Sequence, residues 1–230
     1  MASGFVIAID GPVAAGKGTI ATKLSEDLNG FYLYTGAMYR CLALECINRG
    51  ISVNNEKEVE AILPSVDIDF DNEKALLNGI DVTERIKEAD TANGASIVSV
   101  FPKIREGAVR NQQRIAEKAV HRGQVVVAEG RDTGTKVFPG AKLRVYLMAA
   151  PEVRAKRRLT QYEEQGRVVD FKHVLEEIKE RDERDKTRET DPLPSNPQEL
   201  GYFILDDSTM TEGQTLEMIK TELKRRNLIQ

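Results

Sequence analysis

The sequence of 230 residues has no tryptophan and very few of the side chains that bind metals through sulfur or imidazole. Its two cysteines, Cys41 and Cys46, lie in one predicted helix at a spacing that points them to different faces, and only two histidines, His121 and His173, accompany them. Because there is no C-x-x-C pair, this set does not make a zinc site. So few cysteines fit a reducing compartment, and we expect a cytoplasmic protein.

Long apolar runs are missing as well. The longest, such as Phe5–Ile9 and Val125–Ala128, are far shorter than the roughly 18 residues that a membrane span needs. The N-terminus has neither a basic segment nor an apolar stretch of signal-peptide length. We therefore expect a protein that is neither exported nor inserted into a membrane.

Positive charge is not in excess. The chain has 33 Lys and Arg against 37 Asp and Glu, a net charge of −4, whereas a partner made of duplex nucleic acid would call for a basic surface. Any chemistry on phosphates must therefore be local. The length and the hydrophobic share of 40% predict one large globular domain, or a core domain that carries an insertion.

What the sequence does contain is an alternation of short apolar runs and helical segments, which predicts an α/β fold with a parallel sheet flanked by helices. Strands are predicted at 5–10, 31–34, 125–128, 143–148 and 202–205. Helices are predicted at 18–28, 37–49, 91–100, 103–121, 151–188 with a break near Gly166, and 211–226. The third strand runs into Glu129-Gly130-Arg131-Asp132, and such strand ends are where parallel sheets bind ligands.

Residues 66–82 interrupt this alternation. Polar and apolar residues alternate with a period of two at 66–70, and Asn78-Gly79 is a typical two-residue hairpin turn. The segment predicts a small antiparallel unit inserted into the α/β chain.

A phosphate-binding loop is predicted between the first strand and the first helix. Residues 11–19 read G-P-V-A-A-G-K-G-T, in which glycines let the backbone amides approach phosphate oxygens and Lys17 adds a positive charge. Gly18 stands where the strict motif has a Ser or Thr that binds Mg²⁺. The Thr19 hydroxyl follows one position later, so ligation by Thr19 and ligation through water are both open.

The G-x-G-x-x-A spacing at 16–21 also resembles a dinucleotide fingerprint, which would suit a hydride-transfer enzyme. Lys17 has no role in such a loop, however, and Thr35-Gly36 follows the second strand where an acidic residue would bind the ribose. The Asn-Lys-x-Asp segment of a GTPase switch is absent from the sequence. A P-loop protein that binds nucleotides is therefore favoured over a hydride-transfer enzyme and over a GTPase switch.

Three further motifs carry a resemblance to a known family. They read T-G-A-M-Y-R at 35–40, E-G-R-D-T-G-T at 129–135 and E-R-D-E-R-D-K-T-R at 180–188. Together with the loop at 11–19, and in this order, they resemble the bacterial cytidylate kinases over essentially the whole chain. By spacing alone, the last motif is typical of a solvated helix face.

The resemblance implies transfer of the γ-phosphoryl group of ATP to CMP or dCMP, with Mg²⁺ as cofactor. It implies that Lys17, Arg40, Arg131 and Asp132 act in catalysis. It implies ATP contacts from Gly11, Pro12, Val13, Ala14, Ala15, Gly16, Lys17, Gly18, Thr19 and Arg157, and CMP contacts from Thr35, Tyr39, Arg40, Ser96, Arg105, Arg131, Asp132, Arg181, Asp185 and Arg188. Of these, Ser96, Arg105, Asp132 and Arg188 would surround the base, and Arg181 and Asp185 the sugar.

The same resemblance implies a P-loop kinase core at 1–63 and 101–230, with an inserted monophosphate-binding subdomain at 64–100. A lid is expected at about 151–170, where Arg154, Arg157 and Arg158 are candidates for contact with ATP phosphates. A monomer that acts on free nucleotides, with no nucleic acid polymer and no membrane as partner, is expected. The alternatives are a kinase that prefers UMP or AMP, and a non-catalytic P-loop regulator.

Overall fold

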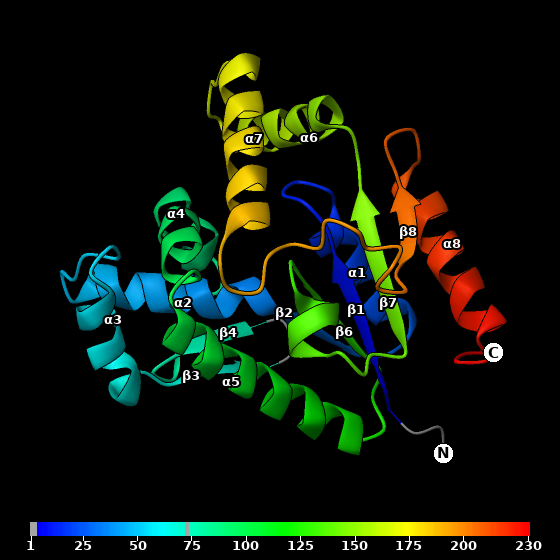
Figure 1. Cartoon of the computed structure of the whole chain (residues 1–230), viewed down its shortest axis with the longest axis horizontal. Helices are drawn as coiled ribbons and strands as arrows, with labels where there is room; N and C mark the ends of the chain where they lie inside the picture. The colour runs from blue at the N-terminus through cyan, green and yellow to red at the C-terminus, as the bar shows by residue number, and fades with distance from the viewer. Residues whose placement is uncertain (1–3, 72–73) are drawn as a thin grey trace.

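A parallel sheet of five strands forms the centre of the computed structural model, which describes residues 4–71 and 74–230 (Figure 1). The strands lie in the order β2 (Phe31–Tyr34), β6 (Val126–Gly130), β1 (Val6–Asp10), β7 (Leu143–Met148) and β8 (Phe203–Asp206). Every neighbouring pair is parallel. The predicted α/β fold is confirmed.

Both faces of this sheet are covered, which explains why its strands are apolar on both sides. One face packs against α1 (Lys17–Asp27) and α8 (Glu212–Arg225), and Ile7 and Ile9 of β1 lie fully buried in that core. The other face packs against α5 (Pro102–His121), with Val126 and Ala128 of β6 in its core. Within the described residues, no helix is long and apolar enough to span a membrane.

The inserted unit is a second, antiparallel sheet of β3 (Ile68–Asp71), β4 (Lys74–Leu77) and β5 (Ile80–Asp81). Asn78 and Gly79 join β4 to β5 with φ angles of 51° and 78°, as a hairpin turn with two left-handed residues requires. The predicted hairpin is therefore confirmed at this turn. The connection between β3 and β4, at residues 72–73, lies outside the described residues.

Three helices and two short 3₁₀ turns surround this sheet. They are α2 (Thr35–Asn48), α3 (Glu56–Ile62), α4 (Ala89–Val98), η1 (Leu63–Ser65) and η2 (Arg85–Lys87). Leu42 and Cys46 of α2 share a core with Val59 of α3 and Ala95 of α4. The sequence reading left α3 out, and its seven residues, capped by Asn55, are too few to show a clear helical period.

Two charged helices, α6 (Pro151–Glu164) and α7 (Phe171–Thr187), lie side by side above the carboxyl ends of the central strands (Figure 1). Gly166 separates them with a φ of 71°, so the predicted break is confirmed. Their shared core is small and includes Tyr162 and Val174. A short π-helix, η3 (Thr133–Val137), follows β6.

The start of α2 differs from expectation. We expected Thr35 and Gly36 to precede a helix that begins at Ala37, but α2 begins at Thr35. The Thr35 hydroxyl does not cap the helix, because it donates a hydrogen bond of 2.7 Å to the Glu129 carbonyl of β6. The Thr35 side chain therefore binds the sheet instead of capping the helix.

Candidate active site

The loop between β1 and α1 has the backbone shape that its glycines predict. Gly11 lies so close to β7 that a Cβ atom there would stand 1.9 Å from the Leu147 carbonyl oxygen, and its φ is 152°. Gly16 precedes α1 with a φ of 81°, and Ala14 also adopts a left-handed φ of 56°. The loop therefore ends at a helix N-terminus, whose free amides favour an anion.

Lys17 lies under this loop and is buried. Its Nζ donates a hydrogen bond of 2.8 Å to the Pro12 carbonyl. Burial, and then the positive charge of Arg131, lowers the pKa of Lys17 to about 7, although Glu129 acts in the opposite direction. An anion at the loop would favour the charged form of Lys17 and raise this pKa.

All ten residues expected to contact CMP line one cavity. It has a volume of ≈ 80 Å³ and is bounded by residues of α2, α4, α5, the β6–η3 connection and the α7 end. The ten are Thr35, Tyr39, Arg40, Ser96, Arg105, Arg131, Asp132, Arg181, Asp185 and Arg188. The structure thus brings together side chains that lie more than a hundred positions apart in the sequence.

Arginines dominate one part of the cavity. Arg131 donates from Nε to Asp185 at 2.6 Å, and although burial disfavours its charged form, that carboxylate keeps the pKa of Arg131 above its usual value. Burial, and then the charge of Arg131, lowers the pKa of Arg181 to about 10. The buried Arg181 Nε has no hydrogen-bond partner among the described residues. The repulsion between the two guanidinium groups, offset in part by Asp185, favours an anionic ligand in this part of the cavity.

Another part of the cavity holds a carboxylate between two arginines. Asp132 pairs with Arg105 through one oxygen, and with Arg188 at 3.0 Å through the other. Burial raises the pKa of Asp132 in spite of these partners. Arg105 also pairs with Asp191 at 3.0 Å and lies over the Tyr39 ring at 5.8 Å. Asp191 was not anticipated, because its proline-rich segment carries no recognisable motif.

Two other predicted residues, Ser96 and Arg40, bind protein groups in this structure. The Ser96 hydroxyl accepts a hydrogen bond of 3.0 Å from Arg184, which joins α4 to α7. Arg40 donates to the Ile86 carbonyl at 2.7 Å and lies over the Tyr34 ring at 5.7 Å. Both side chains keep further donors for a ligand, namely the hydroxyl hydrogen of Ser96 and the other N–H groups of Arg40.

The three candidate lid arginines differ sharply in their surroundings. Arg154 is buried and pairs with Asp182 at 2.6 Å. Arg158 lies over the Tyr162 ring at 4.7 Å. Arg157 pairs with Asp207 at 3.0 Å, and a Cβ atom on Gly16 would lie 3.8 Å from its Nη1. Of the three, Arg157 therefore combines proximity to the phosphate loop with partial exposure.

Asp10 is a buried carboxylate that the sequence reading did not single out. At the end of β1 it accepts hydrogen bonds from the Thr133 amide at 2.8 Å, the Gly134 amide at 2.7 Å and the Tyr202 hydroxyl at 2.7 Å. Burial raises its pKa, whereas these three donors lower it. Asp10 thus fixes the turn directly after Arg131 and Asp132. The sequence offered one signal for this residue, because Asp10 lies at a predicted strand end directly before a glycine loop.

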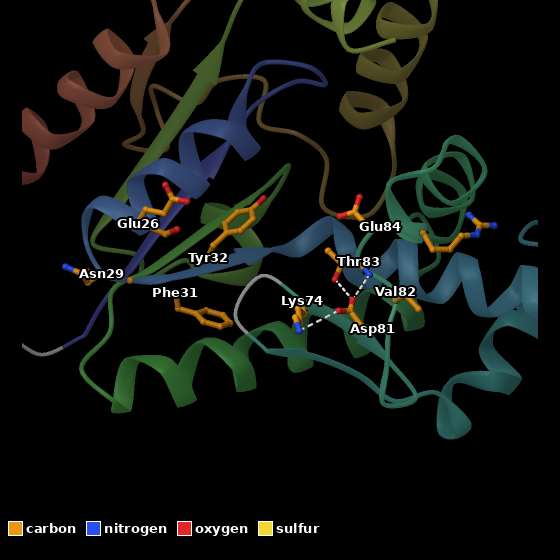
Figure 2. A pocket seen from close by; sticks show the side chains of 12 residues that line it. Glu26, Asn29, Phe31, Tyr32, Lys74, Asp81, Val82, Thr83 and Glu84 are labelled. Carbon is orange, nitrogen blue, oxygen red and sulfur yellow. Dashed lines mark hydrogen bonds and ion pairs between the residues drawn. The ribbon is translucent and has the colours of Figure 1, made fainter. Parts of the chain in front are cut away.

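A much larger cavity lies elsewhere. It has a volume of ≈ 1260 Å³ and opens between the α1–β2 side, with Glu26 and Phe31, and the hairpin, with Lys74, Asp81 and Thr83 (Figure 2). Lys74 and Asp81 face each other there at 3.9 Å, and Thr83 donates to Asp81 at 2.6 Å. It contains none of the predicted site residues. The volume of a cavity alone therefore does not identify the candidate active site.

A protein-family model described as cytidylate kinase matches residues 7–225. The chain belongs to the cytidylate kinase family. It is 39% identical to a cytidylate kinase of Caldanaerobacter subterraneus subsp. tengcongensis, with coverage of 95% of this chain and 94% of that protein. It is 36% identical to a cytidylate kinase of Marinomonas sp., with coverage of 98% of both chains. The resemblance found in the sequence is thereby confirmed.

Among solved structures, the cytidylate kinase fold of this chain is similar to that of more distant proteins. One is an uncharacterized protein from Eubacterium ventriosum, with a TM-score of 0.53, 14% identity and coverage of 96% of this chain and 98% of the other. Another is a sugar kinase from Janibacter sp., with a TM-score of 0.51, 13% identity and coverage of 96% and 95%. At these identities the likeness concerns the fold alone.

Proposed function

We propose that this chain transfers the γ-phosphoryl group of ATP to CMP or dCMP and releases ADP with CDP or dCDP. One observation carries the proposal: a second cationic site, with Arg131 and Arg181, accompanies the phosphate loop and Lys17. A protein that only bound ATP would have no use for it. Membership in the cytidylate kinase family supports the same reaction.

The reaction joins two anions, so catalysis rests on positive charge more than on a base. A phosphomonoester has its second pKa near ~6 and is already a nucleophile at neutral pH. Lys17 and the loop amides would neutralise the ATP phosphates, while Arg40, Arg131 and Arg181 would hold the acceptor phosphate and the sugar. Charge spread over the transferring group would be stabilised by these groups together.

The donors present suit a magnesium ion that arrives with the nucleotide. Among residues 4–71 and 74–230, no group of three or more His, Cys, Asp and Glu side chains could hold a metal. Both oxygens of Asp10 are engaged by protein donors. Mg²⁺ commonly binds through substrate phosphates and water, so Thr19 or waters would complete its shell here. The ion would supply further charge neutralisation.

Cytosine recognition is assigned to the Asp132 side of the cavity. The exocyclic amine of cytosine donates hydrogen bonds, and the adjacent ring nitrogen and carbonyl oxygen accept them. Asp132 provides an acceptor, while Arg105, Arg188 and Ser96 provide donors. Thr35, Tyr39 and Asp185 would complete the nucleoside pocket, with Asp185 and Arg181 against the sugar hydroxyls.

Movement of two segments belongs to the proposal. We assign the monophosphate-binding subdomain to 64–100, the lid to about 151–170 and the kinase core to the rest. Arg157 is the lid arginine assigned to ATP phosphates. A cavity of ≈ 80 Å³ is well below the several hundred Å³ of ordinary ligand pockets, so the acceptor site must open to admit a nucleotide. A cytoplasmic monomer acting on free nucleotides is proposed.

The test is an assay of ADP release from Mg²⁺-ATP with CMP, dCMP, UMP, AMP and GMP in parallel. CMP and dCMP are expected to be well ahead of the others. Faster turnover of UMP or AMP would show that the base pocket is misassigned. ADP release that ignores the monophosphate would indicate an ATPase or a regulator. The variant Arg131→Ala should lose transfer but keep ATP binding.

A further inference from the structure

One residue of the phosphate loop is held on both sides of its backbone by α6 and α7. The Val13 amide donates to Asp182 Oδ1 of α7 at 3.2 Å. The Val13 carbonyl accepts from Arg154 Nη1 of α6 at 2.9 Å. Arg154 and Asp182 are themselves paired at 2.6 Å, and Arg154 Nε donates to the Ala149 carbonyl at 2.9 Å. The loop backbone and the ion pair thus form a closed ring of contacts.

The ion pair is shielded from water, and its role is to hold the loop backbone in place. Arg154 is 3% exposed and Asp182 8% exposed. Val13 and Ala14 pack with their side chains against the apolar core of α6 and α7, which includes Tyr162. Residues of the loop therefore complete the core of the two helices. A shift of the loop must shift this core as well.

Asp182 also stands beside the acceptor site along α7. Its neighbour Arg181 lines the acceptor cavity, and so does Asp185, one helical turn further on. Asp185 binds Arg131, the arginine that follows β6. The phosphate loop and the acceptor cavity are in this way joined by less than two turns of one helix.

We propose that Arg154 and Asp182 are a positioning pair that couples the two nucleotide sites, so that a nucleotide on the phosphate loop tightens binding of the monophosphate. The inference rests on the proposed function for the identity of both ligands. ATP fixes the loop amides, the fixed Val13 holds Asp182, and α7 then presents Arg181 and Asp185 to the acceptor. Coupling of this kind is reciprocal and commonly amounts to about 5–150-fold in affinity.

The first test measures the dissociation constant of CMP by calorimetry with and without a saturating non-hydrolysable ATP analogue. In the wild-type protein the analogue should lower that constant at least about fivefold. Asp182→Asn keeps the shape of the side chain but removes the charge that Arg154 binds, and Arg154→Lys cannot reach three acceptors at once. Both variants should bring the ratio close to one.

Glu183→Gln is the matched control, because Glu183 is the exposed next residue on α7 and should keep the wild-type ratio. A purely structural role would lower the unfolding temperature of Asp182→Asn and leave the ratio unchanged. A wild-type ratio of one, or wild-type ratios in both Asp182→Asn and Arg154→Lys, would overturn the proposal.

A second test does not depend on CMP being the substrate. Amide hydrogen exchange of residues 181–188 is measured with the ATP analogue alone. The analogue should slow exchange there in the wild-type protein and in Glu183→Gln, but not in Asp182→Asn. Equal protection in all three overturns the coupling. If the exchange pattern is as expected but the protein does not phosphorylate CMP, the assigned acceptor is wrong and the coupling stands.

Discussion

The Tyr202 hydroxyl donates a hydrogen bond of 2.7 Å to Asp10 Oδ2, which joins the segment before β8 to the end of β1. The Tyr202 ring also meets the Tyr146 ring edge-on at a centroid distance of 6.0 Å. Because Asp10 holds the amides of Thr133 and Gly134, this one contact supports the turn that carries Arg131 and Asp132.

Tyr202→Phe should therefore destabilise the protein by about 1.5–3 kcal/mol, the usual value of a hydrogen bond to a charged group. The buried carboxylate loses one of its three donors, while the ring packing is kept. Urea unfolding checks the size of the loss, and Tyr202→Leu should cost more because it also removes the ring. We further expect a raised KM for CMP with the KM for ATP unchanged. An unaltered unfolding midpoint would contradict this role of the hydroxyl.

Two glycine-to-alanine changes should have opposite effects. A Cβ atom on Gly130 would stand 2.5 Å from the hydroxyl oxygens of both Thr35 and Thr133, so Gly130→Ala should destabilise the protein and impair CMP binding. Gly107 lies inside α5, and nothing is within 4 Å of its Cβ position. Gly107→Ala should stabilise the protein by about 0.5–1 kcal/mol. Thermal unfolding measures both variants. A lower unfolding temperature for Gly107→Ala than for the wild-type protein would contradict the open space at this Cβ position.

Binding of ATP should be accompanied by proton uptake that depends on Lys17. The pKa of Lys17 is lowered to about 7 by burial and by Arg131, so at pH 8 most free molecules carry it neutral. Bound phosphate favours the ammonium form and raises this pKa, and binding at pH 8 therefore takes up close to one proton. At pH 6 the lysine is already charged and takes up almost none.

Calorimetry in two buffers of different ionisation enthalpy measures this uptake. Lys17→Met provides the baseline, because protons exchanged by ATP itself remain in that variant. Equal uptake at pH 8 in both proteins would show that Lys17 does not titrate there.

Arg157 and Arg158 are adjacent but should differ in their effect on phosphoryl transfer. Arg157 lies near Gly16, and removing one donor of a transition-state charge typically costs ~10²–10³ in kcat. Arg158 rests on the Tyr162 ring, so Arg158→Ala should stay within about twofold of wild type. Steady-state kinetics of both alanine variants tests the assignment. A larger loss for Arg158→Ala would move the phosphate contact to that side chain.

The sequence predicted those parts of the fold in which local pattern and final structure agree. Strands β2 and β7 have the predicted bounds, because their runs of large apolar residues stop at the small residues Thr35-Gly36 and Ala149-Ala150. The acceptor residues could be listed only through the family motifs. Helix α3 could not be predicted because it is too short to show a helical period. The contacts of Asp10 and Asp182 could not be predicted because the amide groups that they bind lie far away in the chain.

The Arg131–Asp185 pair has a consequence for selectivity among anions. A simple anion such as inorganic phosphate or sulfate that binds the Nη groups of Arg131 comes close to the Asp185 carboxylate, which accepts from Nε at 2.6 Å and repels a second negative charge. A nucleotide also brings sugar hydroxyl groups, which can donate hydrogen bonds to that carboxylate. We therefore expect the acceptor site to bind inorganic phosphate and sulfate more weakly than a ligand that carries both a phosphate and a sugar.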